Sequence, residues 1–364
     1  MTPARRAFGA DTETLLRRAA ERLLAYDFKP WFYGDSTGFE GLLAASWLLA
    51  DQRHVDFARA FLRRWAARDE PPGPDDNTAP GLVLCELADR FDDTVLASAA
   101  ERLGEHLETR RHVAGAPVTF EDAGRSLREP YGEGSLTDAE PELLNDPGAG
   151  IYVDCLHFDP PFFAALGVLT GEDVWGARAL AGAAGYVSLL QDRATGLFNH
   201  FWLERRDRAY GLGWGRGQGW ALLGLLDVLD QTVPGSQGRE SLEAAAERLL
   251  AAMLQTQRPD GSWHAVVGVE GSGSETSTAA FMAVAFLRAV RIGVGDASEL
   301  RAAADRAWEA TLSALDDTGL LTGVSAAVYS STVESHYHAV PTGFDVPWGQ
   351  GPLLMAAAEV AMLA

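Results

Sequence analysis

The sequence predicts an all-α protein, an (α/α)6 barrel in which an outer ring of six helices surrounds an inner ring of six. Apolar residues recur three and four positions apart along nearly the whole chain, and strand-like alternation is scarce. This spacing marks twelve helical segments: roughly 12–26, 37–50, 54–68, 78–90, 93–108, 156–169, 173–191, 217–232, 239–256, 276–292, 298–315 and 349–363.

The segments alternate between two kinds, and this alternation is the second observation. One kind opens with glycine or small residues and carries few charges, as at Gly38, Gly217 and Gly349. The other kind is rich in Arg and Glu, as in 240–251. A helix that is apolar all round is surrounded by protein, whereas a helix with a polar stripe faces water on that side. We therefore expect residues 1–364 to form one barrel domain.

The competing architecture is an open helical-repeat solenoid, which also stacks helix pairs. A barrel is favoured because the chain has no fixed sequence period and because the loops before the low-charge helices are aromatic and polar, as pocket walls are. One connection, residues 113–150, is unusually long and rich in Gly, Pro and acidic residues. A loop of that length in a compact domain is usually functional or mobile.

Composition excludes several classes of function. The formal net charge is −21 and Lys29 is the single lysine, so nucleic-acid phosphates are not an expected partner. No apolar run is long enough to cross a bilayer, and a cytoplasmic protein is expected. Cys85 and Cys155 lie in apolar helical patterns, which favours reduced, buried thiols. The sequence does not specify an oligomeric state.

The glycine-rich stretch 211–220 is the most informative motif. It combines Trp214, Arg216 and Trp220 with five glycines immediately before and at the start of a predicted helix. Glycine lets a ligand approach the backbone, arginine offers a planar fork for a carboxylate, and indole faces suit sugar rings. The alternative interpretation is a helix-start turn whose tryptophans fill the core.

Asp154 is the first candidate for chemistry, because it is a carboxylate within an otherwise apolar and aromatic stretch. A carboxyl group there loses solvation when it ionises, so it can hold and donate a proton near neutral pH. The alternative interpretation is a helix N-cap, in which the side chain accepts backbone amide hydrogen bonds. One residue can fill both roles.

Other polar and aromatic residues stand near predicted helix ends. Asp76 precedes a low-charge helix in a turn-like acidic group, and Tyr33, His200 and His264 lie in aromatic loops. The chain has no His-x-x-x-His pattern, no cysteine pair and no acidic calcium loop, so no metal is expected. It has neither a P-loop nor a dinucleotide fingerprint, so no nucleotide cofactor is expected either.

Five motifs occur in a characteristic order: Tyr152-Val-Asp-Cys-Leu-His-Phe158, Thr195-Gly-Leu-Phe-Asn-His200, Trp214-Gly-Arg-Gly-Gln-Gly-Trp220, Asp260-Gly-Ser-Trp-His264 and Glu275-Thr-Ser-Thr-Ala-Ala280. Together they resemble the unsaturated rhamnogalacturonyl hydrolases of glycoside hydrolase family 105 and the related family 88 unsaturated glucuronyl hydrolases. The resemblance extends over nearly the whole chain and implies an (α/α)6 barrel. It also implies removal of a 4,5-unsaturated uronic acid from the non-reducing end of an oligosaccharide made by a polysaccharide lyase.

The resemblance implies a role for each matching residue. Asp154 would donate a proton to C4 of the sugar double bond and then, as a base, activate the water that adds at C5; the resulting hemiketal opens and the glycosidic bond is lost. Asp76 would be the second active-site Asp, and Arg216 would face the uronate carboxylate. The remaining candidates for binding the unsaturated oligosaccharide are Tyr33, Tyr152, His200, Trp214, Gln218, Trp220 and His264.

Two other functions remain open from the residues alone. One is a different barrel enzyme: an inverting glycosidase that uses Asp76 and Asp154, or a sugar epimerase that uses histidines such as His200 and His264. The other is a non-catalytic sugar-binding protein that has kept the barrel, because fold does not fix function.

Overall fold

A computed structural model describes residues 8–29, 33–67, 80–124 and 145–363. Twelve long helices follow one another along the chain: α1 (Ala10–Ala25), α2 (Ser36–Leu49), α3 (Arg53–Ala66), α4 (Gly81–Arg90), α5 (Thr94–Glu108), α8 (Cys155–Thr170), α9 (Asp173–Leu190), α10 (Gly215–Gln231), α11 (Arg239–Thr256), α12 (Ser277–Ile292), α13 (Ala297–Ser313) and α15 (Pro347–Met362). Shorter elements are η1 (Tyr33–Asp35), η2 (Glu204–Arg206) and α14 (Ser335–His338).

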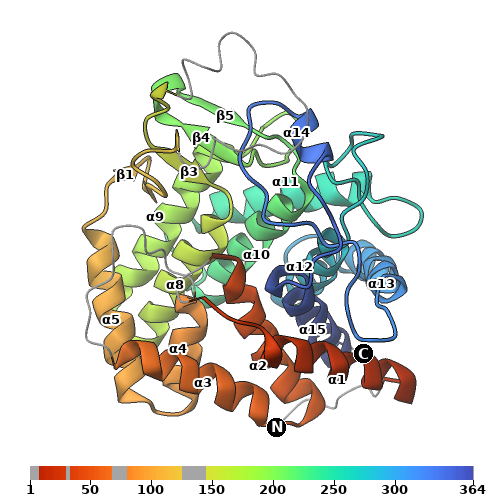
Figure 1. Ribbon diagram of the computed structural model, residues 1–364. Coiled ribbons are helices and arrows are strands. Elements are labelled where there is room, and N and C mark those ends of the chain that lie inside the picture. Colours follow the sequence, from red (N-terminus) through yellow and green to blue (C-terminus); the bar gives the residue numbers. More distant parts are fainter. Residues whose placement is uncertain (1–7, 30–32, 68–79, 125–144, 364) are drawn as a thin grey trace.

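The helices form two concentric rings (Figure 1). The inner ring runs in the order α2, α4, α8, α10, α12 and α15, and each of these helices contacts the next. Because α15 also packs against α2, the ring is closed. The helices α1, α3, α5, α9, α11 and α13 lie outside it. The predicted (α/α)6 barrel is therefore confirmed, and the closure rules out an open solenoid.

Burial follows the two kinds of segment seen in the sequence. Nearly every residue of α10 and α15 is buried, as expected for helices surrounded by protein. The outer helix α3 instead buries a single stripe that includes Val55, Ala58 and Leu62 and exposes its arginines. Within the described residues, no helix is long and apolar enough to cross a membrane.

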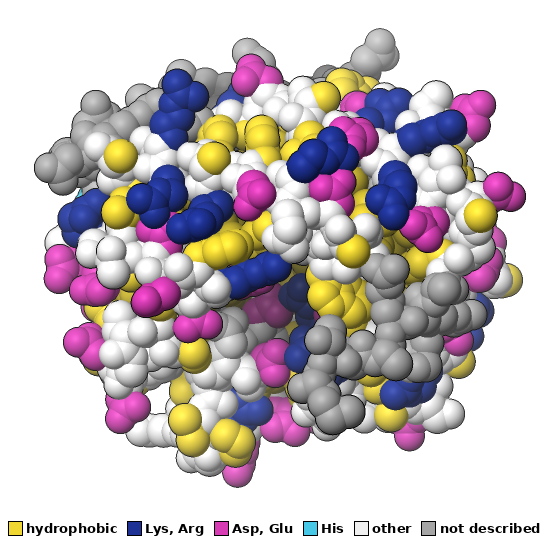
Figure 2. Space-filling view, turned by 90° about the horizontal axis from the view of Figure 1, so that it is seen from below, with side chains coloured by type: hydrophobic (Ala, Val, Ile, Leu, Met, Phe, Trp, Pro, Cys, Tyr) yellow, Lys and Arg dark blue, Asp and Glu magenta, His cyan; other side chains and the backbone are white. Residues whose placement is uncertain are grey.

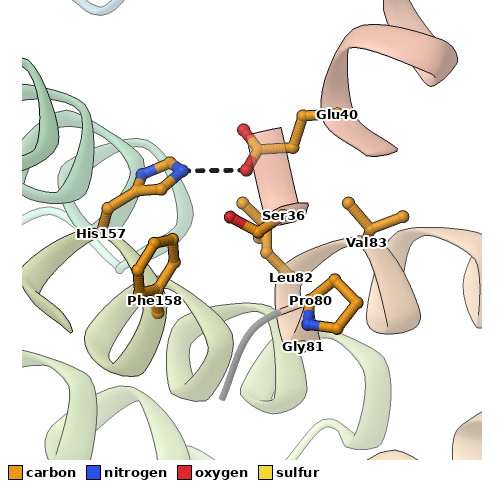
Figure 3. A pocket seen from close by; sticks show the side chains of 8 residues that line it. All are labelled: Ser36, Glu40, Pro80, Gly81, Leu82, Val83, His157 and Phe158. Atoms are coloured by element: carbon orange, nitrogen blue, oxygen red, sulfur yellow. Dashed lines mark hydrogen bonds and ion pairs between the residues drawn. The ribbon is translucent and has the colours of Figure 1, made fainter. Parts of the chain in front are cut away.

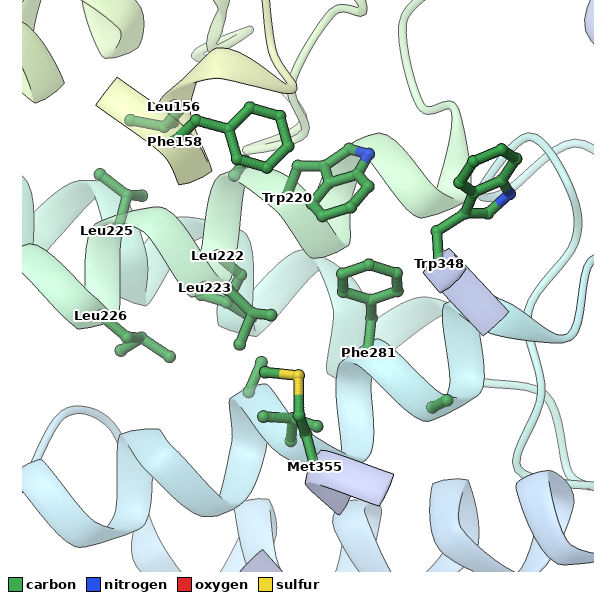
Figure 4. Close-up of a cluster of buried hydrophobic side chains, with 14 of the residues drawn as sticks. Leu156, Phe158, Trp220, Leu222, Leu223, Leu225, Leu226, Phe281, Trp348 and Met355 are labelled. Carbon is green, nitrogen blue, oxygen red and sulfur yellow. The ribbon is translucent and has the colours of Figure 1, made fainter. Parts of the chain in front are cut away.

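The middle of the barrel is filled by aromatic and branched side chains from several inner helices (Figure 4). Trp220 of α10 is fully buried and packs against Phe281 of α12, with ring centroids 4.6 Å apart, and against Phe158 of α8, at 5.3 Å. These contacts join three inner helices. The barrel interior is thus a packed core and not an open channel at this level.

Five short strands are an addition to the all-helical expectation. Strands β1 (His112–Val113) and β2 (Ala116–Pro117) form a hairpin, and β3 (Gly150–Tyr152), β4 (Phe201–Leu203) and β5 (Arg208–Tyr210) form an antiparallel sheet in that order. Strands of two or three residues are too short to show an alternating pattern in sequence. The three-stranded sheet lies at one end of the barrel, together with α14 (Figure 1).

The chain enters each inner helix from this same end. Outer and inner helices alternate along the chain and run in opposite directions, so all inner helices point the same way. Their N-termini consequently meet at one mouth of the barrel, where β3 leads directly into α8. We call this end the N-terminal mouth, and the other end the C-terminal mouth.

The inner ring closes through glycine. A side chain on Gly41 of α2 would come within 2.5 Å of the backbone of Gly351 in α15, and one on Gly351 would come within 2.0 Å of the Thr37 carbonyl oxygen. No Cβ fits at such distances unless the backbone moves. The two helices can therefore pack this closely only because both positions lack a side chain.

We expect Gly351→Ala to lower the free energy of unfolding by about 3 kcal/mol, because the added methyl group must push α2 and α15 apart. Gly176→Ala is the matched control: Gly176 lies within helix α9 and a Cβ there meets nothing within 4 Å. That variant should be about 0.5–1 kcal/mol more stable, since alanine favours helix. Urea unfolding of both variants tests this, and equal stabilities would contradict the proposed closure.

Candidate functional site

The polar residues singled out in the sequence gather at the N-terminal mouth. Asp154 is the N-cap residue of α8, Trp214 is the N-cap of α10, and Arg216 lies in the first turn of α10. None of the six inner helices has a capping hydrogen bond from its own N-cap side chain. Helix N-termini carry partial positive charge, so this mouth favours an anionic ligand even in a protein of net charge −21.

Strand pairing brings Asp154 and His200 together. Strand β3 pairs with β4 so that Tyr152 lies opposite Phe201, and the backbone N–H of Val153 donates to the His200 carbonyl at 2.8 Å. Asp154 follows immediately. Its Oδ2 lies 3.6 Å from His200 Nε2, and both side chains are almost fully buried. A contact between residues 46 positions apart thus depends on a sheet of only three short strands.

Asp154 occupies the N-cap position, but its carboxylate makes no capping hydrogen bond. The N-cap interpretation therefore describes its location and not its side-chain interactions. The carboxylate lies beside the imidazole of His200, whose Nδ1 is 2.8 Å from the hydroxyl of Tyr337. Tyr337 comes from α14, far along the chain, and orients the histidine ring from the side opposite to Asp154.

Aromatic rings surround His200. The His200 ring centroid is 4.3 Å from that of Trp214 and 5.8 Å from that of Tyr152, which meets it edge to face. The Tyr152 hydroxyl lies 3.2 Å from the Ser330 hydroxyl. The structure thus places Tyr152, His200 and Trp214 in one cluster, with Asp154 at its edge.

Arg216 is buried and its guanidinium is already partly engaged. Its Nη1 donates to Glu275 Oε1 at 3.3 Å and to Ser325 Oγ at 2.6 Å, and its Nη2 donates to the Ala326 carbonyl at 3.0 Å. The guanidinium also lies over the Trp214 ring at 4.9 Å. Since arginine has five N–H donors, two remain without an acceptor among the described residues.

Glu275 balances the charge of Arg216 and also fixes the start of α12. Its carboxylate accepts hydrogen bonds from the backbone N–H groups of Ser277 and Thr278 and from both of their hydroxyls. A carboxylate with so many donors is held in one orientation. Arg216 therefore rests against a rigid counter-charge.

Gln218 and Trp220, two of the predicted binding residues, serve the framework in this structure. The Gln218 amide bonds to both the N–H and the C=O of Phe198, at 2.7 and 2.9 Å, and to the Trp214 carbonyl. It thereby fastens the segment that carries His200 to α10. Trp220 is 0% exposed and packs in the core, which is the alternative interpretation of the glycine-rich motif.

Three predicted residues remain: His264, which the structure describes, and Tyr33 and Asp76, whose side chains it does not describe. His264 is partly buried in the loop before α12, and its backbone forms an antiparallel bridge with Ser274. Tyr33 begins η1, but its side chain is outside the described part. Asp76 lies outside the described residues altogether.

A small cavity lies beside Pro80, immediately before α4. It has room for about one water molecule, at about 10 Å³, and Gly81, Ser36 and Phe158 help to line it. Figure 3 shows the His157 side chain of α8 pointing across it at Glu40 of α2, with Nε2 and Oε1 2.8 Å apart. Burial opposes protonation of His157, but the neighbouring Glu40 and Asp227 outweigh it and raise the histidine pKa.

Within the described residues, one group has ligand atoms close enough to share a metal ion: Glu21, Asp51 and His54. This group lies at the C-terminal mouth, where α2 ends, and away from Asp154. Arg53 binds both carboxylates, with its Nη2 at 2.6 Å from Glu21 and 2.7 Å from Asp51. The guanidinium already neutralises these ligands.

Sequence reasoning missed several residues of the N-terminal mouth. Tyr337, Ser325 and Trp348 were not expected, and Glu275 was part of a motif without an assigned role. The Trp348 ring lies 5.8 Å from the Arg216 guanidinium, and its Nε1 donates to the Ser325 carbonyl at 3.0 Å. The run Ser335-His-Tyr-His338 is a dense group of hydrogen-bonding side chains that could have drawn attention to Tyr337. Nothing in the local pattern around Ser325 indicates that its loop folds over α10, and nothing around Trp348, in the first turn of α15, indicates that its ring meets Arg216.

Comparison with known proteins supports the family resemblance. The model of Glycosyl Hydrolase Family 88 matches residues 17–364, which confirms the resemblance read from the five motifs. The unsaturated rhamnogalacturonyl hydrolase YesR of Bacillus subtilis is 22% identical over 353 residues, covering 95% of this chain and 94% of YesR. Protein Atu3128 of Agrobacterium fabrum is 30% identical over 231 residues, 56% of this chain and 98% of that protein.

Solved structures share the fold. A possible member of the GH105 family from Salmonella enterica has a TM-score of 0.78 at 18% identity, covering 98% of this chain and 95% of that chain. The unsaturated glucuronyl hydrolase of Bacillus sp. GL1, described as responsible for glycosaminoglycan degradation, has a TM-score of 0.69 at 17% identity, covering 97% of both chains. At such identities these likenesses establish the barrel alone.

Asp35 lies beside the N-terminal mouth, and the burial of its carboxyl group makes the stability of the protein depend on pH. It is 1% exposed, and its Oδ2 accepts the Lys29 backbone N–H at 2.6 Å. Burial raises its pKa from 3.8 to about 6, despite that hydrogen bond. The native state therefore keeps this proton to higher pH than the unfolded chain does, and the contribution of Asp35 to stability falls as pH rises from about 4 through 6.

We expect Asp35→Asn to remove this fall. Relative to the wild type, the variant should gain up to about 3 kcal/mol of unfolding free energy between pH 4 and pH 7. Urea unfolding at both pH values measures the change, with Asp56→Asn on the exposed face of α3 as the control. If the difference in unfolding free energy between the wild type and the variant does not vary with pH, Asp35 is not desolvated in the native state.

Proposed function

The chain belongs to glycosyl hydrolase family 88, and from this premise we propose that it removes a 4,5-unsaturated uronic acid from the non-reducing end of lyase-generated oligosaccharides. One observation carries the proposal: a nearly buried carboxylate, Asp154, lies 3.6 Å from His200 at the mouth where the inner helices begin. That mouth favours an anion, and a uronate is an anion.

Asp154 acts first as an acid and then as a base. The protonated carboxyl donates its hydrogen to C4 of the double bond, and positive charge develops at C5 and the ring oxygen. A water molecule adds at C5 and returns a proton to the Asp154 carboxylate. The hemiketal then opens to a ketone at C5, and the hemiacetal left at C1 releases the rest of the oligosaccharide as an alcohol. One carboxyl group is sufficient because it is regenerated in each turnover.

His200 and its partners set the environment of this carboxyl group. The Tyr337 hydroxyl holds His200 from one side, which leaves Nε2 directed at Asp154. Asp76, in the segment before α4, is the proposed second acidic residue. Tyr33, Tyr152, Trp214 and His264 are the proposed sugar contacts, while Gln218 and Trp220 support the site from beneath.

Arg216 binds the uronate carboxylate in this proposal. Its two uncommitted N–H donors match the two oxygens of a carboxylate, and its position at the start of α10 adds the dipole of that helix. Glu275, Ser325 and the Ala326 carbonyl hold the guanidinium still. Binding therefore orders few additional atoms.

Two further proposals concern the domain organisation and the cellular compartment. We propose that the chain acts as one catalytic domain, since one hydrophobic cluster includes residues from all twelve long helices. We also propose a reducing compartment, the cytoplasm, because Cys85 and Cys155 are both buried free thiols. A screen of lyase-generated oligosaccharides would identify the sugar beyond the cleaved bond. Loss of the ultraviolet absorbance of the double bond reports turnover of each oligosaccharide.

Asp154→Asn should lower kcat at least about 1000-fold on an unsaturated disaccharide, because the amide can neither donate the proton to C4 nor accept one from water. The measurement is loss of the double-bond absorbance, with circular dichroism to check the fold. Asp146→Asn, an exposed acid before β3, is the control and should keep full activity. Normal turnover by Asp154→Asn would reject the assignment. Cleavage of saturated glycosides by the wild type would instead favour an inverting glycosidase.

Arg216→Lys should reduce kcat/KM about 100-fold on the unsaturated uronate, because an ammonium group cannot replace the planar fork. The comparison substrate is the corresponding methyl ester, which lacks the carboxylate charge. If Arg216 recognises that charge, Arg216→Lys should lose far less kcat/KM on the ester than on the acid. Comparing both enzymes on both substrates then isolates the contribution of this one contact to kcat/KM. An equal loss on both substrates would mean that Arg216 only supports the fold.

A further inference from the structure

A second cavity opens at the C-terminal mouth, at the opposite end of the barrel from Asp154. Its volume is about 440 Å³, within the range of small-molecule sites. Figure 2 looks onto this end of the molecule, where acidic and basic side chains border a recess near the centre of the face. The cavity is lined by all the inner helices except α8. Neither the motifs nor the proposed hydrolysis uses it.

The cavity wall is acidic. Five carboxylates face three guanidinium groups, an excess of two negative charges; the lining acids are Glu40, Glu86, Asp227, Asp230 and Glu359, and the arginines are Arg90, Arg288 and Arg291. Protonation of the nearby His157 would still leave an excess of one. The helices that line the wall end here, and helix C-termini carry partial negative charge that favours cations.

Arg288 does not satisfy the acids around it. It donates to Asp227 Oδ1 at 2.7 Å and to Glu359 Oε1 at 3.1 Å. The second oxygens, Asp227 Oδ2 and Glu359 Oε2, are buried without a hydrogen-bond partner, as is Glu40 Oε2. Asp227 is 7% exposed and Glu359 is 4% exposed. Asp227 Oδ2 lies 3.8 Å from His157 Nδ1 and Glu359 Oε2 lies 3.9 Å from Arg291 Nε, which is ion-pair distance but too long for a hydrogen bond. Buried acceptors without a hydrogen bond are costly.

Glu86 extends this acidic wall from α4. Its side chain is exposed to the cavity and no hydrogen-bond partner is found for it among the described residues. Desolvation by the protein around the cavity, together with the charges of Glu40 and Asp227, raises the pKa of Glu86, and Arg90 only partly opposes this. A cation in the cavity would lower the cost of keeping Glu86 charged.

Apolar side chains share the wall with the acids. Leu43, Leu82, Met355 and Met362 contribute aliphatic surface, and Trp47 contributes an indole. Aliphatic stems bury well against such side chains, and indole faces attract cations. A ligand that combines an apolar chain with a positive end matches both parts of the wall.

A metal ion matches the wall less well. Among the described residues, the cavity acids do not come close enough to one another to form a three-ligand set, in contrast to Glu21, Asp51 and His54. An ammonium group supplies three N–H donors and does not require its acceptors to converge at metal-ligand distances.

We propose that the C-terminal mouth is a binding site for a small aliphatic amine. The ammonium group is held by Glu86 and by the carboxylates around Arg288, and the carbon chain lies against Trp47 and the neighbouring leucine and methionine side chains. With His157 neutral, a diamine matches the excess of two negative charges; with His157 protonated, one ammonium group balances the wall. This site is separate from the hydrolytic one, so its occupancy does not depend on the proposed reaction.

The test is isothermal titration calorimetry of the full chain with 1,5-diaminopentane, with 1,5-pentanediol and pentanoate as neutral and anionic probes of similar length. Diaminopentane should bind and the other two should not. Glu86→Gln should weaken binding about fivefold or more, because it removes a charged hydrogen-bond acceptor. Glu105→Gln, which removes an exposed acid on the outer helix α5 that does not line the cavity, is the control and should bind as the wild type does.

Trp47→Leu is a second variant, which keeps apolar volume but removes the indole, and it should also weaken diaminopentane binding. Four results would overturn the proposal: no heat with the diamine, binding of pentanediol or pentanoate with equal affinity, tight binding of calcium or magnesium that displaces the diamine, or unchanged affinity in both Glu86→Gln and Trp47→Leu. Each readout is independent of hydrolytic activity.

Discussion

The contact between α2 and α15 is the constraint on which the rest of the structure depends. These are the first and last inner helices in the chain, and the ring is closed only if they pack together. Gly41 and Gly351 allow their backbones to approach to a distance at which no side chain fits. The inner helices already share one direction because they alternate with antiparallel outer helices, and closing the ring holds their N-termini together at one mouth.

This closure gives the two mouths opposite electrical character. The N-terminal mouth has the positive ends of the helix dipoles, and there the chain places Asp154, His200 and Arg216. The C-terminal mouth has the negative ends, yet it carries Asp227 and Glu359, with Arg288 between them. Arg216, Asp227, Arg288 and Glu359 stand in inner helices that are mostly buried, and Asp154 stands at the start of another.

Charged residues at unfavourable positions are informative because folding alone does not explain them. Arg216 is a cation in the first turn of a helix, where the dipole disfavours it, and the protein keeps it there with Glu275, itself fixed by the start of α12. Asp154 occupies an N-cap position without making a capping bond. Neither arrangement is needed to start a helix, and each places a charged group at the N-terminal mouth, where we propose that the uronate binds.

The sequence by itself determined the helices, their division into inner and outer rings, and the motifs that contain Asp154, His200 and Arg216. These are local properties: the 3.6-residue period and the contrast between apolar and charged segments are encoded within single helices. The tertiary structure alone decided that β3 pairs with β4 and so brings Asp154 to His200, that Tyr337 and Ser325 return to the mouth, and that Gln218 and Trp220 support the site from within. It also decided that Glu86, Asp227 and Glu359 share a cavity. These outcomes depend on which distant segments meet, and contacts between distant residues leave no periodic pattern in the chain.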